Sequence, residues 1–373
     1  MRIGITCFPS LGGSGVVAAE LGKALAARGH QVHFITSRLP FRLEELGENL
    51  YFHPVHPMPY PVFETPPYTI ALASVISQVS QREGLDLLHA HYAVPHSTAA
   101  ILGREACECE LKVVTTLHGT DTRLVGLDPS YWPITRWSIE RSDGVTAVSR
   151  YLRDLSVRDF HLTRPVEVIY NFVDTQRFRP ACCPFLREKL AAPEEKVLVH
   201  VSNFRPLKRV PDLIRVFSQV AKRVKARFLL VGHGPQHAEA ERLARDLEVS
   251  EQVNFLGVLE DVSPVLSVSD VYLCGSEQES FGLAVLEAMS CAVPPVATAV
   301  GGLRELVTSG ETGYLVPFGD WEAMVERTVE LLRNEDRRRE MGERSRQRAI
   351  QHFDKEIIVQ QYERFYERVL EQG

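Results

Sequence analysis

The chain has 373 residues, of which 45% are apolar and 24% charged, so it can bury two cores of ordinary domain size. Its net charge of -6 is spread along the sequence, which argues against nucleic acid or an anionic membrane as a partner. No apolar run approaches the roughly 20 residues of a membrane span, and the N-terminus shows no signal-peptide pattern. We therefore expect a soluble, cytoplasmic protein.

Strand and helix patterns alternate through the first half of the chain. The predicted strands lie at 2–7, 31–36, 85–90, 112–117, 144–147 and 166–169. The predicted helices lie at 15–28, 70–81, 97–107, 131–141 and 150–159. Near-continuous apolar strands in βα order are typical of a parallel sheet covered by helices on both faces.

A second series follows the irregular stretch 174–193. Its predicted strands lie at 197–202, 227–231, 253–256, 270–274, 295–297 and 313–316. Its predicted helices lie at 210–223, 236–247, 262–266, 281–290, 303–307 and 320–332, followed by a helical tail at 336–353 and 355–370. We predict an α/β protein with two Rossmann-like, doubly wound domains, 1–173 and 174–354, facing a central cleft, with the helix at 355–373 packed back on the first domain.

The seven cysteines form no C-x-x-C pair and have no histidines at zinc spacing, so we expect reduced thiols. Cys7, Cys274 and Cys291 lie in apolar segments and should act as small apolar residues. Cys182 and Cys183 lie in a Pro-flanked loop, and we assign them no function.

A glycine-rich loop follows the first strand. Gly12-Gly13-Ser14-Gly15 opens the first predicted helix, where backbone N–H groups can approach an anion because no Cβ intervenes. A nicotinamide cofactor would need G-x-G-x-x-G spacing and an acidic residue after the second strand, which here ends Ile35-Thr36-Ser37. We therefore expect no cofactor.

Two carboxylates, Glu279 and Glu287, frame the start of the predicted helix 281–290. The N–H groups at 280–283 can face a diphosphate at the positive end of the helix dipole. Glu287 can chelate the diol of a ribose, and Glu279 can accept hydrogen bonds from sugar hydroxyls. The alternative is an ordinary amphipathic helix with Glu287 solvated and Glu279 a loop charge.

Two further polar segments follow strand ends. His118 comes directly after the strand 112–117, where its imidazole can face the cleft while Asp121 holds its tautomer. The alternative is a loop histidine that is bonded to the backbone. Arg205 and Lys208 follow the strand 197–202 and can neutralise a pyrophosphate leaving group. The alternative for this pair is a solvated basic turn.

Together these features resemble the family 4 type of retaining GT-B glycosyltransferases, the large family that includes sucrose and glycogen synthase relatives. The matching features cover essentially the whole chain: the glycine-rich loop, the basic segment 202–208, Val231-Gly232-His233-Gly234-Pro235, the two glutamates, Gly301-Gly302-Leu303-Arg304-Glu305 and the tail helix. The N-terminal domain is most similar to the branch of this family that acts in bacillithiol biosynthesis, in the runs 3–15, 33–42, 88–96, 118–121 and 169–174.

This resemblance implies transfer of N-acetylglucosamine from UDP-N-acetylglucosamine to the hydroxyl of L-malate, with retention. No metal is expected, because no Asp-x-Asp motif lies at a strand end. The implied catalytic residues are His118, Arg205, Lys208 and Glu279. The implied donor-binding residues are Gly13, Asn203, Arg205, Lys208, Val258, Glu279, Ser280, Phe281, Gly282, Leu283 and Glu287. The acceptor-binding candidates are Ser14, Tyr92, Thr116, Asn171 and one cation, Arg141 or Arg150, although Arg141 also fits a surface helix.

Three alternatives stay open. One is a related transferase that uses another UDP- or GDP-sugar with a lipid or glycan acceptor. The others are a UDP-sugar epimerase and a protein that binds a sugar nucleotide without catalysis. A homo-oligomer is possible, and the sequence does not fix its size.

Overall fold

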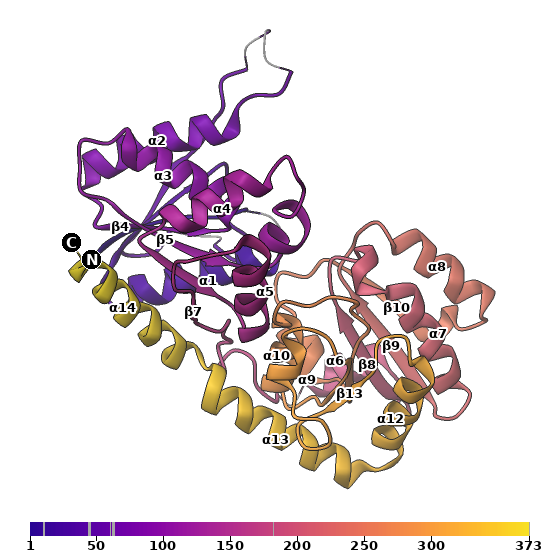
Figure 1. Cartoon of the computed structure of the whole chain (residues 1–373). Coiled ribbons are helices and arrows are strands. Elements are labelled where there is room, and N and C mark those ends of the chain that lie inside the picture. The colour runs from indigo at the N-terminus through magenta and orange to yellow at the C-terminus, as the bar shows by residue number, and fades with distance from the viewer. Residues whose placement is uncertain (10–11, 44–45, 60, 62–63, 182, 373) are drawn as a thin grey trace. The chain divides into compact units, whose positions relative to one another are not determined.

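The computed structural model of the chain describes residues 1–9, 12–43, 46–59, 61, 64–181 and 183–372 (Figure 1). It divides into two compact units, one of Met1–Asn171 with Glu356–Gly373 and one of Phe172–Lys355. Each unit holds one parallel sheet whose strands alternate with helices along the chain. The predicted α/β class with two Rossmann-like sheets is confirmed.

The N-terminal unit contains a seven-stranded parallel sheet in the order β3-β2-β1-β4-β5-β6-β7. Its strands are β1 (Arg2–Thr6), β2 (Gln31–Thr36), β3 (Leu50–Pro54), β4 (Leu87–His91), β5 (Lys112–Leu117), β6 (Gly144–Ala147) and β7 (Glu167–Val168). Its helices are α1 (Gly13–Ala27), α2 (Tyr68–Glu83), α3 (Thr98–Glu105), α4 (Trp132–Arg141), α5 (Arg150–Phe160) and α14 (Lys355–Glu371), with short π-helical turns η1 (Ala93–Ser97) and η2 (Asp121–Val125).

Apolar faces explain where these helices pack. Leu72 and Ile76 of α2 and Ile101 of α3 are fully buried in one cluster with Val113 of β5. Local signals also fix helix ends: the side chain of Ser149 caps α5 by accepting from the N–H of Leu152.

The tail helix α14 belongs to the N-terminal unit. Its Tyr362 and Tyr366 are fully buried, and the Tyr366 hydroxyl lies 2.7 Å from Nδ1 of His89 on β4. At its exposed side, Glu363 accepts from Nε of Arg28 at 2.9 Å. The helix therefore covers the face of the sheet on which His89 lies.

The C-terminal unit contains a six-stranded parallel sheet in the order β10-β9-β8-β11-β12-β13. Its strands are β8 (Lys196–Val201), β9 (Ala226–Val231), β10 (Val253–Gly257), β11 (Val271–Cys274), β12 (Pro295–Thr298) and β13 (Tyr314–Val316). Its helices are α6 (Pro184–Leu190), α7 (Val210–Ala221), α8 (His237–Asp246), α9 (Ser263–Ser267), α10 (Leu283–Ser290), α11 (Leu303–Leu306), α12 (Trp321–Arg333) and α13 (Glu335–Phe353), with short 3-10 turns η3 (Pro206–Lys208) and η4 (Ser250–Gln252).

The strand order reverses once in each sheet, between β1 and β4 and again between β8 and β11. Connections leave the two central strands in opposite directions at such a switch point, which opens a crevice beyond their C-terminal ends. The polar segments at Ser14, Tyr92, Lys208 and Glu279 all follow these four strands.

Two elements were not predicted, and one began late. The edge strand β3 is only partly buried, so its residues carry no continuous apolar signal. No residue of α6 is buried, so that helix lacks an apolar stripe. The helix predicted from 281 starts at Leu283, because Gly282 takes a left-handed conformation with φ +101.

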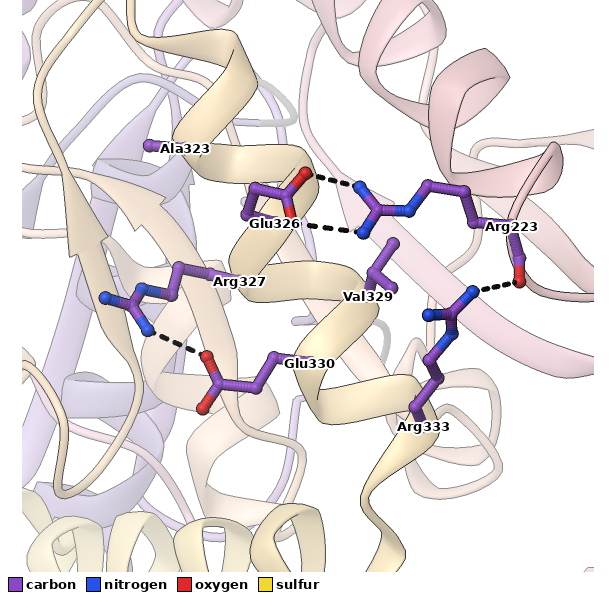
Figure 2. A pocket seen from close by; sticks show the side chains of 7 residues that line it. All are labelled: Arg223, Ala323, Glu326, Arg327, Val329, Glu330 and Arg333. Carbon is purple, nitrogen blue, oxygen red and sulfur yellow. Dashed lines mark hydrogen bonds and ion pairs between the residues drawn. The ribbon is translucent and has the colours of Figure 1, made fainter.

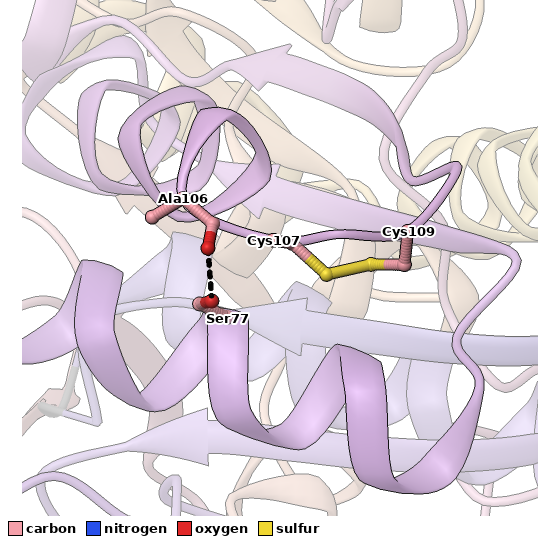
Figure 3. Close-up of a disulfide and its surroundings, with 4 residues drawn as sticks. All are labelled: Ser77, Ala106, Cys107 and Cys109. Carbon is pink, nitrogen blue, oxygen red and sulfur yellow. Dashed lines mark hydrogen bonds between the residues drawn. A yellow bond between two sulfur atoms is a disulfide. The ribbon is translucent and has the colours of Figure 1, made fainter.

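The expectation of reduced thiols is wrong for one pair. Cys107 and Cys109 form a disulfide in the turn after α3 (Figure 3), where their Cα atoms are 5.2 Å apart. The Ser77 hydroxyl of α2 donates to the carbonyl of Ala106 at 3.1 Å and anchors the same turn. The pairing was missed because the turn, and not a recognised motif, brings the two thiols together.

The remaining thiols that the structure describes are free, with Cys7, Cys274 and Cys291 buried. Cys182 lies outside the described residues. Within the described ranges, no helix combines the length and apolar character that crossing a bilayer requires.

Candidate active site

An ion pair bridges the switch point of the C-terminal unit. Lys208 at the end of η3, after β8, donates from Nζ to Oε2 of Glu279, in the loop after β11, at 2.5 Å. The Ser276 hydroxyl donates to the same carboxylate oxygen at 3.2 Å. The backbone N–H of Glu277 donates to the carbonyl of Leu207 at 2.8 Å, which ties the two loops together.

Burial decides the character of this pair. The side chains of Lys208 and Glu279 are 20% and 16% exposed. Burial alone would lower the pKa of the Lys208 ammonium, but the charge of Glu279 raises it above its ordinary value. The solvated-turn alternative is therefore wrong for Lys208. Arg205 is exposed, and its guanidinium has no hydrogen bond or ion pair within the described part of the chain.

Glycines shape the loop that carries Glu279. At Gly282 a Cβ would lie 2.5 Å from Cδ2 of Leu303, and φ is +101. A Cβ on Gly302 would meet the carbonyl oxygen of Ser280 at 2.2 Å, so the Gly301-Gly302 turn presses against this loop. The N–H of Gly302 donates to the carbonyl of Glu279 at 2.9 Å. The loop is thus held at the start of α10, whose first N–H groups have no side-chain cap.

Glu287 lies within α10 and is only 4% exposed. The alternative of an amphipathic helix with a solvated Glu287 is therefore wrong. Phe281, beside it in the motif, is also buried and meets the ring of Phe353 edge to face at 5.7 Å between centroids. Carboxylates are rarely buried to this extent, and Glu287 lies on a helix that starts near the C-terminal ends of the strands, so it stays a candidate donor contact.

The other predicted donor residues follow β8, β9 and β10. A Cβ on Gly234 would lie 1.9 Å from the carbonyl oxygen of Asn203, so only glycine lets these loops approach. The N–H of Gly232 donates to the carbonyl of Gly257 at 2.7 Å. Val258, the next residue, is 47% exposed. These residues and the ion pair thus follow the C-terminal ends of four adjacent strands.

A neutral hydrogen bond bridges the switch point of the N-terminal unit. The Ser14 hydroxyl of α1 donates to the Tyr92 hydroxyl, after β4, at 3.0 Å, and both side chains are buried. Tyr92 has φ +103, a conformation that costs a non-glycine residue of order 1–3 kcal/mol and that clusters at functional sites. Gly13 begins α1, and a Cβ there would meet nothing within 4 Å.

His118 lies beside these residues and is oriented by a histidine that sequence reasoning missed. Nε2 of His118 lies 2.9 Å from Nδ1 of His91, and the ring of Tyr92 is 5.4 Å away between centroids. The expected role of Asp121 is wrong. Its buried carboxylate accepts from the backbone N–H groups of His118, Gly119 and Ala93 and not from the imidazole.

A period-two signal could have found His91. His89 and His91 are two residues apart on β4, so both side chains lie on the same face of the sheet. Their ring centroids are 4.2 Å apart. Burial lowers the pKa of His89, His96 and His118 to about 3 each, so these rings are neutral at pH 7.

Two predicted acceptor residues are in the wrong place. The Thr116 side chain is fully buried, and its hydroxyl lies 2.6 Å from both His89 Nε2 and Thr146 Oγ1. Arg141 ends α4, where its carbonyl accepts from Arg104, just before the chain enters β6. It therefore lies at the N-terminal edge of the sheet, on the order of 16 Å from the opposite edge at about 3.3 Å per residue.

Asn171 and Arg150 fit the expected edge better. Arg150 begins α5 directly after β6, at the C-terminal edge, and is exposed. Asn171 follows β7 and is 6% exposed, and its Oδ1 has no hydrogen-bond donor among the described residues. A buried carbonyl oxygen of this kind suits a hydroxyl donor.

A surface hollow in the C-terminal unit lies elsewhere (Figure 2). It is lined by Arg223, Ala323, Glu326, Arg327, Val329, Glu330 and Arg333. Each cation already has a partner, since Arg223 pairs with Glu326, Arg327 with Glu330, and Arg333 donates to the carbonyl of Arg223. Arg223 leads into the start of β9, at the sheet edge opposite to Lys208, so we assign this hollow no function.

Comparison with known families gives two matches. The family described as "Glycosyltransferase Family 4" matches residues 11–177, and "Glycosyl transferases group 1" matches residues 184–348. The chain is 46% identical to the N-acetyl-alpha-D-glucosaminyl L-malate synthase of Bacillus anthracis over 371 residues, 99% of this chain and 97% of that protein. It is 31% identical to a GDP-mannose-dependent phosphatidylinositol monomannoside mannosyltransferase of Mycolicibacterium smegmatis over 258 residues, 65% of this chain and 66% of that protein.

Solved structures share the fold. A sucrose-phosphate synthase from Thermosynechococcus elongatus superposes with a TM-score of 0.84 at 22% identity, covering 100% of both chains. HepE of Anabaena, solved in complex with UDP-glucose, superposes with a TM-score of 0.81 at 22% identity, again over 100% of both chains. These neighbours place both units in the two-domain GT-B fold.

Proposed function

We propose, since the chain belongs to the same glycosyltransferase family as the N-acetyl-alpha-D-glucosaminyl L-malate synthase of Bacillus anthracis, that it transfers N-acetylglucosamine from UDP-N-acetylglucosamine to the hydroxyl of L-malate. The observation that carries the proposal is the Lys208–Glu279 pair at the switch point of the C-terminal unit. It sets a cation for a leaving diphosphate beside a carboxylate for sugar hydroxyls. The 46% identity, over nearly the full length, to a relative named N-acetyl-alpha-D-glucosaminyl L-malate synthase supports the choice of acceptor.

The cations of this edge suit a diphosphate. An ammonium has three N–H donors, so Lys208 can keep one bond to Glu279 and still offer others to phosphate oxygens. The exposed guanidinium of Arg205 adds a planar fork. The uncapped first N–H groups of α10, beginning at Leu283, add the positive end of a helix dipole.

The remaining donor contacts follow from charge and position. We assign Glu287 to the ribose hydroxyls, because a carboxylate on α10 near the C-terminal ends of the strands can accept hydrogen bonds from two hydroxyl groups. We assign Glu279 to hydroxyls of the transferred sugar. The exposed turn at Val258 would pack against the uracil, and Gly13 would leave room for the donor phosphates or sugar.

The reaction balances without another reactant. The malate hydroxyl oxygen forms a bond to C1 of the sugar, and the bond from C1 to the β-phosphate oxygen of UDP breaks. The hydroxyl proton passes to a phosphate oxygen of the leaving UDP on the same face, which retains the configuration. Lys208 and Arg205 stabilise the charge that develops on that phosphate, and such preorganised groups are commonly the largest catalytic contribution. We propose that no metal is needed, and we place the reaction in the cytoplasm.

The acceptor site that we propose contains fewer residues than the sequence predicted. We retain Ser14, Tyr92 and Asn171 as contacts of malate, with Arg150 as the cation for a carboxylate. Thr116 and Arg141 are left out because one is enclosed and the other lies at the opposite edge of the sheet. His118, with its neutral ring, would contact a hydroxyl of the transferred sugar.

A substrate panel tests this function. The purified chain would be incubated with UDP- and GDP-sugars and with several hydroxy acids, with and without EDTA, and the products weighed by mass spectrometry. We expect acceptor-dependent UDP and a product of N-acetylglucosamine plus malate, unaffected by EDTA. A new sugar nucleotide without acceptor would indicate an epimerase, and transfer only to lipid or glycan would replace the acceptor.

A further inference from the structure

We propose that His91 is a positioning residue that fixes His118 in the tautomer protonated on Nδ1, so that His118 donates a hydrogen bond to a hydroxyl oxygen of the substrate. The substrate contact rests on the proposed function, whereas the tautomer does not. His91 has no role in the transferase assignment above. It acts through His118 and would not touch the sugar.

The geometry leaves each ring one free nitrogen. His91 ends β4 and pairs in register with Thr116 of β5, which places it beside His118 just past the end of that strand. Nδ1 of His91 and Nε2 of His118 are 2.9 Å apart, so one carries a proton and the other accepts it. Nδ1 of His118 has no partner in the described part of the chain and is the nitrogen that remains for a ligand.

Both rings are neutral, so only two proton arrangements are compatible with this hydrogen bond. Burial lowers the pKa of His91 well below its ordinary value and that of His118 to about 3, and neighbouring imidazoles act in the same direction. In the first arrangement the Nδ1–H group of His91 donates a hydrogen bond to Nε2 of His118. The neutral His118 ring then carries its own proton on Nδ1. In the second, His118 donates from Nε2, and His91 must carry its own proton on Nε2.

The surroundings of His91 decide between them. Its Nε2 is buried and has no hydrogen-bond partner among the described residues. The second arrangement would bury an N–H without an acceptor, whereas the first leaves only an unpaired lone pair. Orphaned buried N–H groups are rarer than under-satisfied acceptors, so the first arrangement is favoured. His118 then faces the ligand as a donor.

The fold also holds the His118 backbone in place. The Asp121 carboxylate accepts from the N–H groups of His118 at 3.2 Å, Gly119 at 2.8 Å and Ala93 at 3.0 Å. The turn after β5 is thereby tied to the turn after β4 that carries Tyr92. Since both the backbone and Nε2 are fixed, the direction of the Nδ1–H group is fixed as well.

Nuclear magnetic resonance of the full chain labelled with ¹⁵N-histidine tests the tautomer directly. Long-range ¹H–¹⁵N correlations, assigned with His118→Gln, should show Nδ1 protonated and Nε2 unprotonated in the free protein. In His91→Leu the proton should no longer be confined to Nδ1, and kcat should fall by about 10–100-fold, by analogy with the loss of a hydrogen-bond partner that orients a metal-bound histidine. UDP affinity should stay within about twofold. His91→Asn, whose amide nitrogen can donate from nearly the same place, should restore both the tautomer and most of the turnover.

A matched histidine pair separates positioning from folding. His33 on β2 is also buried and lies 2.9 Å from His53, away from the strand ends that carry the site. His33→Leu should therefore lower stability without changing kcat.

An Nε2–H tautomer in the wild-type protein, or a normal kcat in His91→Leu, would overturn the inference. If His91→Leu does not fold, His91→Gln replaces it, because its amide cannot occupy the Nδ1 position. The resonance measurement needs no substrate, so a failed transfer assay would count against the proposed function and not against the tautomer.

Discussion

The two units share a topology but bridge their switch points with different chemistry. In the C-terminal unit, Lys208 and Glu279 bridge it as a partly exposed ion pair. In the N-terminal unit, Ser14 and Tyr92 bridge it as a buried, uncharged hydrogen bond. Fixed charges suit a ligand whose negative charge grows during reaction, whereas neutral donors suit hydroxyls and orientation. This difference is the basis for our proposal that one unit serves the leaving group and the other recognises the acceptor.

The largest expected effect is at the charged bridge. Lys208→Ala should lower kcat by about 10²–10³, because it removes a preorganised cation from the leaving phosphate. The unfolding free energy should also fall, because Glu279 loses its partner. Steady-state kinetics with a denaturation curve would measure both, and Lys225→Ala, a 77% exposed lysine, is the control. An unchanged kcat in a folded variant would remove Lys208 from the mechanism.

The next effect concerns the buried carboxylate. Glu287→Ala should weaken UDP binding by about 1.5–3 kcal/mol, the range for hydrogen bonds to a charged group. Isothermal calorimetry would measure this affinity, with Glu305→Ala on α11 as a partly exposed carboxylate control. A UDP affinity unaffected by the change would show that the ribose is held elsewhere.

Acid should destabilise the fold through its buried neutral histidines. Unfolded histidines titrate near pH 6.5, so below that pH the unfolded chain binds protons that the folded chain does not. Stability should therefore fall as the pH drops from about 6.5, by up to about 1.4 kcal/mol per pH unit for each ring, until the folded pKa is reached. The rings concerned have folded pKa values of about 3 or 4: His33, His89, His96, His118 and His200. Urea unfolding midpoints between pH 7.5 and pH 5 would measure the slope, and a flat profile would contradict neutral burial.

The smallest effect is at the neutral bridge. Ser14→Ala and Tyr92→Phe should each lower the ratio of kcat/KM for L-malate to that for L-lactate by a factor of about 2–10. This factor is the equivalent of one ordinary hydrogen bond. UDP affinity should stay nearly constant, because we propose both residues as contacts of the acceptor and not of the donor. Because the two hydroxyls bond each other, the double variant should lose less than the sum of the single losses. Equal losses of UDP and malate affinity would break the contrast between the units.

Sequence patterns predicted the fold, but neither the Lys208–Glu279 ion pair nor the geometry of the neutral site. Strand periodicity and βα order predicted both sheets, because the strands are buried and apolar. Lys208 and Glu279 were named as candidate site residues because each follows the end of a strand, but their pairing with each other was not predicted. Arg141 was misplaced because it ends α4 just before β6 begins, so it lies at the N-terminal ends of the strands. The candidate site lies at their C-terminal ends. Thr116 was misplaced because the tail helix, more than two hundred residues away in the chain, covers its face of the sheet.

The role of Asp121 shows a second limit. Proximity in sequence suggested a bond to the His118 ring, but the carboxylate serves three backbone N–H groups instead. The true partner, His91, comes from the neighbouring strand, and the pairing register of β4 and β5 brings it there. Contacts across strands depend on register, which the local pattern around a single residue does not contain.

The most direct test of the proposed activity is the ratio of kcat/KM for L-malate and L-lactate with UDP-N-acetylglucosamine. Malate brings a second carboxylate, and in its absence the donors built for it would stay unpaired at about 1–3 kcal/mol each, more where a charge is involved. We predict a preference for malate of at least about a hundredfold. Equal use of the two acids, or no transfer to either beside strong transfer to a lipid or glycan, would contradict the assignment of the acceptor.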